Sequence, residues 1–279
     1  MIKHADLQET VIPPIPWNTV YNEDGILLQS SGEGTNLVVF PGLEGSGESC
    51  LHLLLPMQEK AFADNAPLRL ILVNYAHENH VTLIDLIASV NKGLKKLLGN
   101  DSCIFFAQSF GNLLAAGVLE LNQIHVKKAL MVSPFTSLPS LLTKMSVAVL
   151  YVTPTFLYRA TIKPLGRYVF GPVGENGNHP FFGSLARATS SQVKRQTQWM
   201  VNAQFDDLYT SINIPAKIWL GEKDRLVDLD EQLLFFKNLA SRKMDFVLAI
   251  IPDCGHVVLP DKAATFMKAD LYEWLTPES

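Results

Sequence analysis

One short stretch of the sequence carries residue types that could perform nucleophilic chemistry. An apolar run at 103–106 leads into Ala107-Gln108-Ser109-Phe110-Gly111, and a helix-forming run follows at once. A serine in a small-x-Ser-x-Gly turn between a strand and a helix is held at a tight corner, where its hydroxyl can act as a nucleophile. On this motif alone, a serine that merely precedes a glycine at a helix start is an equally good interpretation.

A serine hydroxyl is a weak nucleophile, so it needs a base near neutral pKa, and histidine supplies one. His256 follows the last apolar run, and Asp224 follows the apolar run before it. A carboxylate is needed to fix the tautomer of the imidazole and to stabilise the imidazolium that forms. Taken singly, Asp224 and His256 each have a simpler interpretation that involves no catalysis. Asp224 could be a solvated turn residue, with Asp228 or Asp230 in its role, and His256 could cap a loop.

A glycine-rich segment, Pro-Gly-Leu-Glu-Gly-Ser-Gly at 41–47, follows the apolar run 36–40. Glycines at a strand end let the backbone turn its N–H groups toward a ligand. The segment lacks the Gly-Lys-Ser/Thr ending of a phosphate-binding P-loop. An oxyanion loop, which needs backbone donors and no lysine, is the favoured interpretation. A plain strand-to-helix turn is the alternative.

The elements that must position these residues alternate along the chain. A hairpin at 19–21 and 26–29, with a turn carrying Asp24-Gly25, comes first. Strands are then predicted at 36–40, 68–73, 103–106, 128–133, 216–220 and 246–251. Helices are predicted at 48–62 (kinked or split at Pro56), from a capping-box start at 82–85, from the elbow to about 121, at 230–240 and at 261–275. Such alternation predicts an α/β fold with parallel strands, in which loops at the carboxyl edge of the sheet can bring Ser109, Asp224 and His256 together.

Between 134 and 207 the alternation breaks. We expect this region to be a helical cap inserted in a core made of 1–133 and 208–279. Its apolar side chains could line a substrate pocket or simply pack the cap onto the sheet: Leu150, Phe156, Leu157, Tyr158, Phe170, Phe181, Phe182 and Trp199. The segment 147–157 could rest on a lipid surface, but burial under the cap is preferred.

Composition excludes several classes of protein. The chain of 279 residues is 48% hydrophobic and 18% charged, with a net charge of −4, as in ordinary soluble globular proteins. Basic residues occur in no run longer than a pair, which argues against a nucleic-acid partner. The three cysteines lack metal-type spacing, the N-terminus lacks an apolar signal core, and the apolar stretch 145–157 is too short to span a bilayer. We expect a cytoplasmic protein without a transmembrane segment.

Taken together, these motifs resemble the α/β-hydrolase superfamily. The resemblance covers nearly the whole chain: 40–46 is similar to the His-Gly-x-x-Gly-Ser oxyanion loop, 107–111 to the nucleophile elbow, 221–224 to the acid loop and 255–256 to the base loop. Pro41 replaces the usual histidine, and Ala107 and Asn112 stand where glycine is common.

The resemblance implies a role for each matched residue. Ser109 would be the nucleophile, His256 the general base and then acid, and Asp224 the orienting carboxylate. The backbone N–H groups of Leu43 and Phe110 would form the oxyanion hole, with Gly42 in the supporting loop, and no metal or cofactor would be needed.

The expected function is that of a serine hydrolase. It would cleave a small-molecule carboxylic ester or thioester with an apolar acyl or aromatic portion, through an acyl-enzyme. The same triad could instead serve a C–C bond hydrolase, an acyltransferase or a carrier thioesterase of a biosynthetic pathway. A non-catalytic binding protein of the same fold is the alternative from another class.

Overall fold

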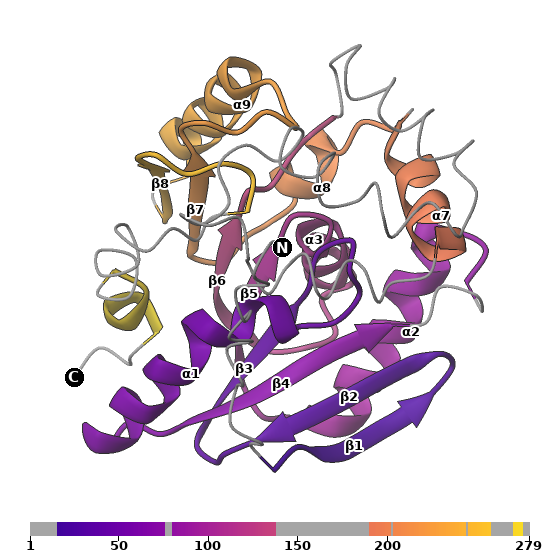
Figure 1. The fold of residues 1–279 in the computed structure, drawn as a ribbon, viewed down its shortest axis with the longest axis vertical. Coiled ribbons are helices and arrows are strands. Elements are labelled where there is room, and N and C mark those ends of the chain that lie inside the picture. The colour runs from indigo at the N-terminus through magenta and orange to yellow at the C-terminus, as the bar shows by residue number, and fades with distance from the viewer. Residues whose placement is uncertain are drawn as a thin grey trace, which may run out of the picture.

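The computed structural model describes residues 16–75, 80–137, 190–201, 203–243, 245–257 and 270–275. Within this part of the chain one sheet of eight strands runs through the molecule in the order β1-β2-β4-β3-β5-β6-β7-β8 (Figure 1). The strands are β1 (Asn18–Glu23), β2 (Ile26–Ser31), β3 (Thr35–Phe40), β4 (Leu68–Tyr75), β5 (Cys103–Gln108), β6 (Val126–Val132), β7 (Ala216–Gly221) and β8 (Phe246–Ile251).

The sheet is mostly parallel, as the alternation predicts. From β4 through β3, β5, β6 and β7 to β8, every neighbouring pair is parallel. Only β1 and β2 form an antiparallel hairpin, and β2 pairs antiparallel with β4. Asp24 and Gly25 take positive φ angles of 52° and 72° in the hairpin turn, which these residue types tolerate. The predicted α/β fold class is therefore confirmed.

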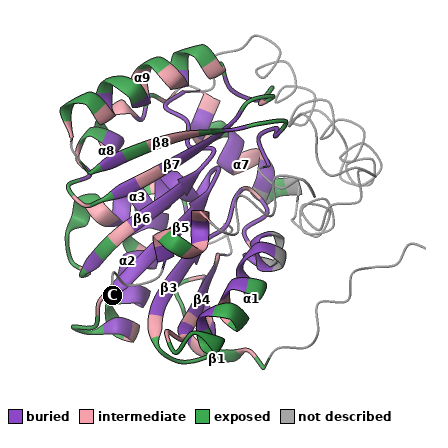
Figure 2. Ribbon diagram, turned by 90° about the vertical axis from the view of Figure 1, so that its left-hand side faces the viewer, coloured by how far each residue is buried: buried purple, intermediate pink, exposed green. Residues whose placement is uncertain are grey.

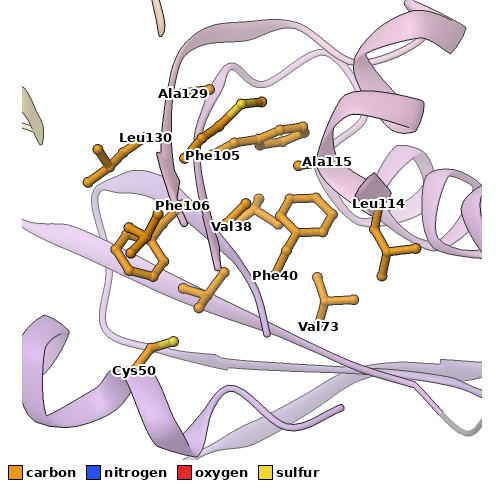
Figure 3. Close-up of a cluster of buried hydrophobic side chains, with 14 of the residues drawn as sticks. Val38, Phe40, Cys50, Val73, Phe105, Phe106, Leu114, Ala115, Ala129 and Leu130 are labelled. Atoms are coloured by element: carbon orange, nitrogen blue, oxygen red, sulfur yellow. The ribbon is translucent and has the colours of Figure 1, made fainter. Parts of the chain in front are cut away.

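Helices cover both faces of the sheet. They are α1 (Glu48–Ala63), α2 (Leu83–Leu98), α3 (Gly111–Leu121), α7 (Ser190–Val201), α8 (Asp206–Thr210) and α9 (Leu229–Arg242), and 270–275 is also helical. Helices α2 and α3 pack together on one face, and α1 lies on the other (Figures 1 and 3). Most of the predicted cap, 138–189 with residue 202, lies outside the described residues, as does the first part of the predicted last helix.

Two helix predictions can be compared directly with the structure. Thr82 is the N-cap of α2 and forms a capping box with Asp85, as the spacing predicts, because each side chain accepts a backbone N–H of the other residue. Helix α1 runs through Pro56, so the predicted split is wrong, while the predicted alternative, a kink, stays a prediction. Pro56 is exposed on this helix.

The core lies on both sides of the central strands, because a parallel sheet covered by helices buries both faces. All residues of β5 are buried, and in Figure 2 the middle of the sheet is purple while much of α9 is green. Neighbouring Phe105 and Phe106 point to opposite faces (Figure 3). Phe105 packs edge-on against Phe40 at 4.8 Å on the side of Leu114, which ties β3, β5 and α3 together.

This topology decides where polar side chains can meet. Strands β5, β7 and β8 run in the same direction, so the loops that follow them emerge at one edge of the sheet. Each of the three loops carries one of the predicted catalytic side chains. No helix among the described residues is long and apolar enough to cross a bilayer.

Candidate active site

Ser109 stands at a strained corner directly after β5. Its φ of 52° lies in the left-handed region, which is uncommon for serine and costs on the order of 1 kcal/mol. Its N–H donates to the carbonyl of Val132 at 2.9 Å, which anchors the corner to β6. A Cβ on Gly111 would lie 2.4 Å from the carbonyl oxygens of Phe40 and Pro41, so the turn needs glycine there. The predicted strand–turn–helix elbow is present.

Asn112, which stands where glycine is common, has a structural role of its own. This residue is fully buried at the start of α3, and its side-chain N–H₂ donates to the carbonyls of Ser109 and Val132, both at 2.9 Å. The backbone N–H of Asn112 also donates to the Ser109 carbonyl, at 2.9 Å. Both amide protons are therefore used to hold the nucleophile corner against β6. A glycine, the common residue there, could not make these bonds.

The three predicted catalytic side chains form one continuous hydrogen-bonded chain. Ser109 Oγ lies 2.8 Å from His256 Nε2, although the two residues are 147 positions apart. On the other side of the ring, His256 Nδ1 lies 2.7 Å from Asp224 Oδ2. The side chains of His256 and Asp224 are each 1% exposed, so water does not compete for these bonds. The two hydrogen-bond distances and the order of the three side chains are those that a Ser-His-Asp triad requires.

Asp224, and not its neighbours in sequence, faces the histidine. Its second oxygen, Oδ1, accepts the backbone N–H of Leu226 at 2.8 Å and of Val227 at 3.3 Å, which fixes the carboxylate plane. Asp228 is occupied elsewhere, because its side chain caps α9 by accepting the N–H of Glu231 at 3.1 Å. Asp230 lies exposed in the first turn of α9.

The acid loop and the base loop are bonded to each other. Lys223 N–H donates to the Cys254 carbonyl at 2.7 Å, which joins the loops that carry Asp224 and His256. The approach is close enough that a Cβ on Gly221 would lie 2.2 Å from the Gly255 carbonyl oxygen. This backbone contact sets the distance between Asp224 and His256.

The glycine-rich loop lies against Ser109. A Cβ on Gly42 would come within 3.4 Å of the Ser109 Cβ. Among the described residues, no acceptor is hydrogen-bonded to the backbone N–H of Leu43 or of Phe110. Phe110 is fully buried, and a buried N–H without a partner is rare in folded proteins. Two free donors beside a serine are what an oxyanion hole requires.

Two residues that sequence reasoning did not single out for a role hold this loop. Glu44 is buried, and its Oε1 accepts the N–H of Gly42 at 3.2 Å. Tyr75, the last residue of β4, donates its hydroxyl to the carbonyl of Gly42 at 2.6 Å, and the same oxygen lies 3.0 Å from the carbonyl of Pro41. Burial and the nearby Glu44 carboxylate raise the Tyr75 pKa well above its usual value, so the hydroxyl stays a donor. The only sequence signal was a polar aromatic residue at a strand end.

One of the apolar residues predicted to line a pocket is described, and it lies near the elbow. Trp199 of α7 stacks on the ring of Phe110, with 6.4 Å between ring centroids. The other seven predicted lining residues lie outside the described residues. No cluster of three or more potential metal-ligating side chains occurs in the described segments.

Comparisons with known proteins agree with this architecture. No family model and no curated protein matches the sequence. Solved structures do match. An esterase from Exiguobacterium antarcticum has a TM-score of 0.73 at 15% identity, over 90% of this chain and 96% of that one. Carboxylesterase CesB from Bacillus subtilis has a TM-score of 0.68 at 17% identity (94% and 92%). A bromoperoxidase from Bacillus anthracis has a TM-score of 0.69 at 14% identity (90% and 95%). These likenesses show that the chain has the α/β-hydrolase fold.

Proposed function

We propose that the protein is a serine hydrolase that cleaves a small carboxylic ester or thioester without a cofactor. The observation that carries the proposal is the unbroken chain of hydrogen bonds from Ser109 through His256 to Asp224, with distances of 2.8 and 2.7 Å. The fold is compatible with several activities, so the proposal rests on these side chains and their geometry. Several structural neighbours are esterases by name, which agrees with the proposed chemistry.

In the first half of the proposed reaction, Ser109 Oγ attacks the carbonyl carbon of the substrate. With its Nδ1–H donated to Asp224, His256 has a lone pair on Nε2, and this atom takes the serine proton. The carbonyl π bond opens, and its electron pair becomes an oxyanion. The N–H groups of Leu43 and Phe110 would stabilise that charge. His256 then gives the proton to the departing alcohol or thiol as the bond to it breaks.

In the second half, a water molecule replaces the leaving group. His256 takes one proton from the water as its oxygen attacks the acyl-serine carbonyl, and a second oxyanion forms. Collapse of this intermediate breaks the bond to Ser109 Oγ, which recovers the proton from His256. The products of this half are a carboxylic acid and the free enzyme. No step changes an oxidation state, so no redox partner is needed.

We assign an apolar acyl or aromatic portion to the substrate, and the cap role to residues 134–207. Support comes from Trp199, which lies beside Phe110 and therefore beside one proposed oxyanion donor. Phe135 and Phe205 pack edge-on at 6.2 Å where the chain leaves and re-enters the sheet. Aromatic side chains at this edge of the sheet favour an apolar group over a small, highly charged one.

The substrate class can be tested with a panel of p-nitrophenyl esters of increasing chain length, run beside acyl-coenzyme A thioesters. We expect turnover of at least one ester series and its loss in Ser109→Ala. A rate optimum above acetate would support an apolar acyl site. Hydrolysis of thioesters alone would restrict the proposal to thioesterase chemistry, and ester hydrolysis undiminished in Ser109→Ala would contradict it.

A further inference from the structure

The peptide bond between Gly42 and Leu43 connects the proposed oxyanion hole to a tyrosine. The described chain contains no cis peptide bond, so the Gly42 carbonyl and the Leu43 N–H point to opposite sides of this planar unit. The carbonyl accepts the Tyr75 hydroxyl at 2.6 Å and the Gly45 N–H at 3.1 Å. The direction of the carbonyl is thereby fixed, and with it the direction of the N–H.

We infer that Tyr75 is a positioning residue of the oxyanion hole, whose hydroxyl orients and polarises the peptide that presents the Leu43 N–H. The inference rests on the proposed function, because it gives Tyr75 a role in stabilising charge on the reacting carbonyl oxygen. Tyr75 acts through the peptide and is not itself in the hole.

Without a restraint such as Tyr75, the backbone of the glycine-rich loop is free to change its conformation. Gly42 and Gly45 flank Leu43 and Glu44, and glycine leaves the backbone free to rotate between several conformations. Tyr75 restrains this freedom at two places. Its hydroxyl bonds to the Gly42 carbonyl, and its backbone N–H donates to the Gly45 carbonyl at 3.3 Å.

The tyrosine is held firmly in place and contacts both the glycine-rich loop and Phe110. It is 5% exposed, and its backbone is fixed at the end of β4. Its ring centroid lies 6.2 Å from that of Phe110, the residue that offers the second donor. A hydroxyl on a ring packed in this way loses little freedom when it bonds, which makes it a good restraint on a glycine-rich loop.

The hydrogen bond also affects the strength of the donor. Donation to a peptide carbonyl polarises the amide and makes the N–H of the same peptide a better donor, as in any hydrogen-bonded chain. The benefit grows as negative charge develops on the substrate oxygen. The effect of removing the hydroxyl should therefore appear in kcat, while KM changes little.

The test compares Tyr75→Phe with Tyr209→Phe. Both variants remove one hydroxyl from a buried ring, but Tyr209 belongs to α8 and packs against Phe235 and Phe236 of α9. For each we would measure kcat and KM on the best ester of the panel, and the affinity for an alkyl trifluoromethyl ketone, which forms a tetrahedral adduct with the serine. Thermal unfolding of both variants accounts for any loss of stability.

For Tyr75→Phe we expect kcat to fall about tenfold, KM to stay within about twofold and trifluoromethyl ketone affinity to fall about tenfold. Tyr209→Phe should match the wild type in all three. Wild-type kcat and ketone affinity in Tyr75→Phe would overturn the inference, as would equal losses in both variants. Failure of the proposed function would look different, because the wild-type protein would then neither hydrolyse esters nor bind the ketone.

Discussion

The side-chain amide of Asn112 donates to the carbonyl of Ser109 at 2.9 Å, three residues back along the chain. The other amide proton goes to the Val132 carbonyl, which also accepts the Ser109 N–H. The strained corner is therefore closed by a small ring of hydrogen bonds between the elbow and β6. This ring depends on a side-chain donor at position 112, which a glycine could not supply.

Two replacements of Asn112 distinguish the loss of its hydrogen-bond donors from added electrostatic repulsion between oxygen atoms. Asn112→Ala removes two buried hydrogen bonds and should lower the free energy of unfolding by about 2 kcal/mol. Asn112→Asp has nearly the same shape but places carboxylate oxygens against two carbonyl oxygens, and should cost about 3 kcal/mol or more. Urea denaturation measures both. An aspartate variant as stable as the wild type would show that the amide does not hold the corner.

Asp224 and Asp228 form a matched pair of aspartates four positions apart. Asp224→Asn would permit the wrong histidine tautomer, so kcat should fall by about 10⁴ with little loss of stability. Asp228→Asn should keep activity, because it changes only the cap of α9, at a cost below about 1 kcal/mol. Steady-state kinetics and urea denaturation of the two variants provide the comparison. Equal activity in both variants would show that Asp224 does not orient His256 for the reaction.

Substitutions at Gly111 and Gly99 compare the cost of a steric clash with the cost of backbone strain. Gly111→Ala would place a methyl group 2.4 Å from two backbone oxygens of the β3 end. We expect a loss of about 3 kcal/mol in unfolding free energy and of most activity. Gly99 has a φ of 57° and a ψ of −111°, a conformation that favours glycine, but no atom lies within 4 Å of an added Cβ. Gly99→Ala should therefore cost about 2 kcal/mol through backbone strain and leave activity intact. The reverse order would show that the elbow has room for a side chain.

The cysteines should be unreactive in the folded protein. All three are buried, and desolvation raises the pKa of Cys103 and of Cys254 to about 12 because it disfavours the thiolate. At pH 8 only about one such thiol in 10⁴ is ionised. Reaction with Ellman's reagent between about pH 7 and 9 should therefore be slow, and unfolding in urea should release three thiols. Fast modification of the native protein would show that one of these sites opens.

Much of the fold follows from local patterns in the sequence. The buried strands are continuous apolar runs, the hairpin turn carries Asp24-Gly25, and the spacing of Thr82 and Asp85 marks the start of α2. Alternation of strands and helices implies a parallel sheet, and this topology brings the loops with Ser109, Asp224 and His256 to one edge. The strand order, with β4 between β2 and β3, does not follow from any single stretch.

The support around the site could not be read from the sequence, because it depends on contacts between distant elements. Asn112 looks like a departure from the elbow pattern until β6 is placed beside it. Tyr75 becomes important only when the end of β4 lies under the loop after β3. Pro56 suggests a helix break, but α1 continues through it. For Asn112 and Tyr75 the tertiary partner decides the role of the residue.

The central claim is that Ser109 is a nucleophile activated by His256, and active-site labelling tests it most directly. The folded protein would be treated with a fluorophosphonate, and the adduct located by intact mass and by peptide mapping. We expect one adduct per chain, on Ser109, with no labelling of Ser109→Ala and strongly slowed labelling of His256→Ala. Absence of an adduct on the wild-type protein, or an adduct that persists in Ser109→Ala, would contradict the account.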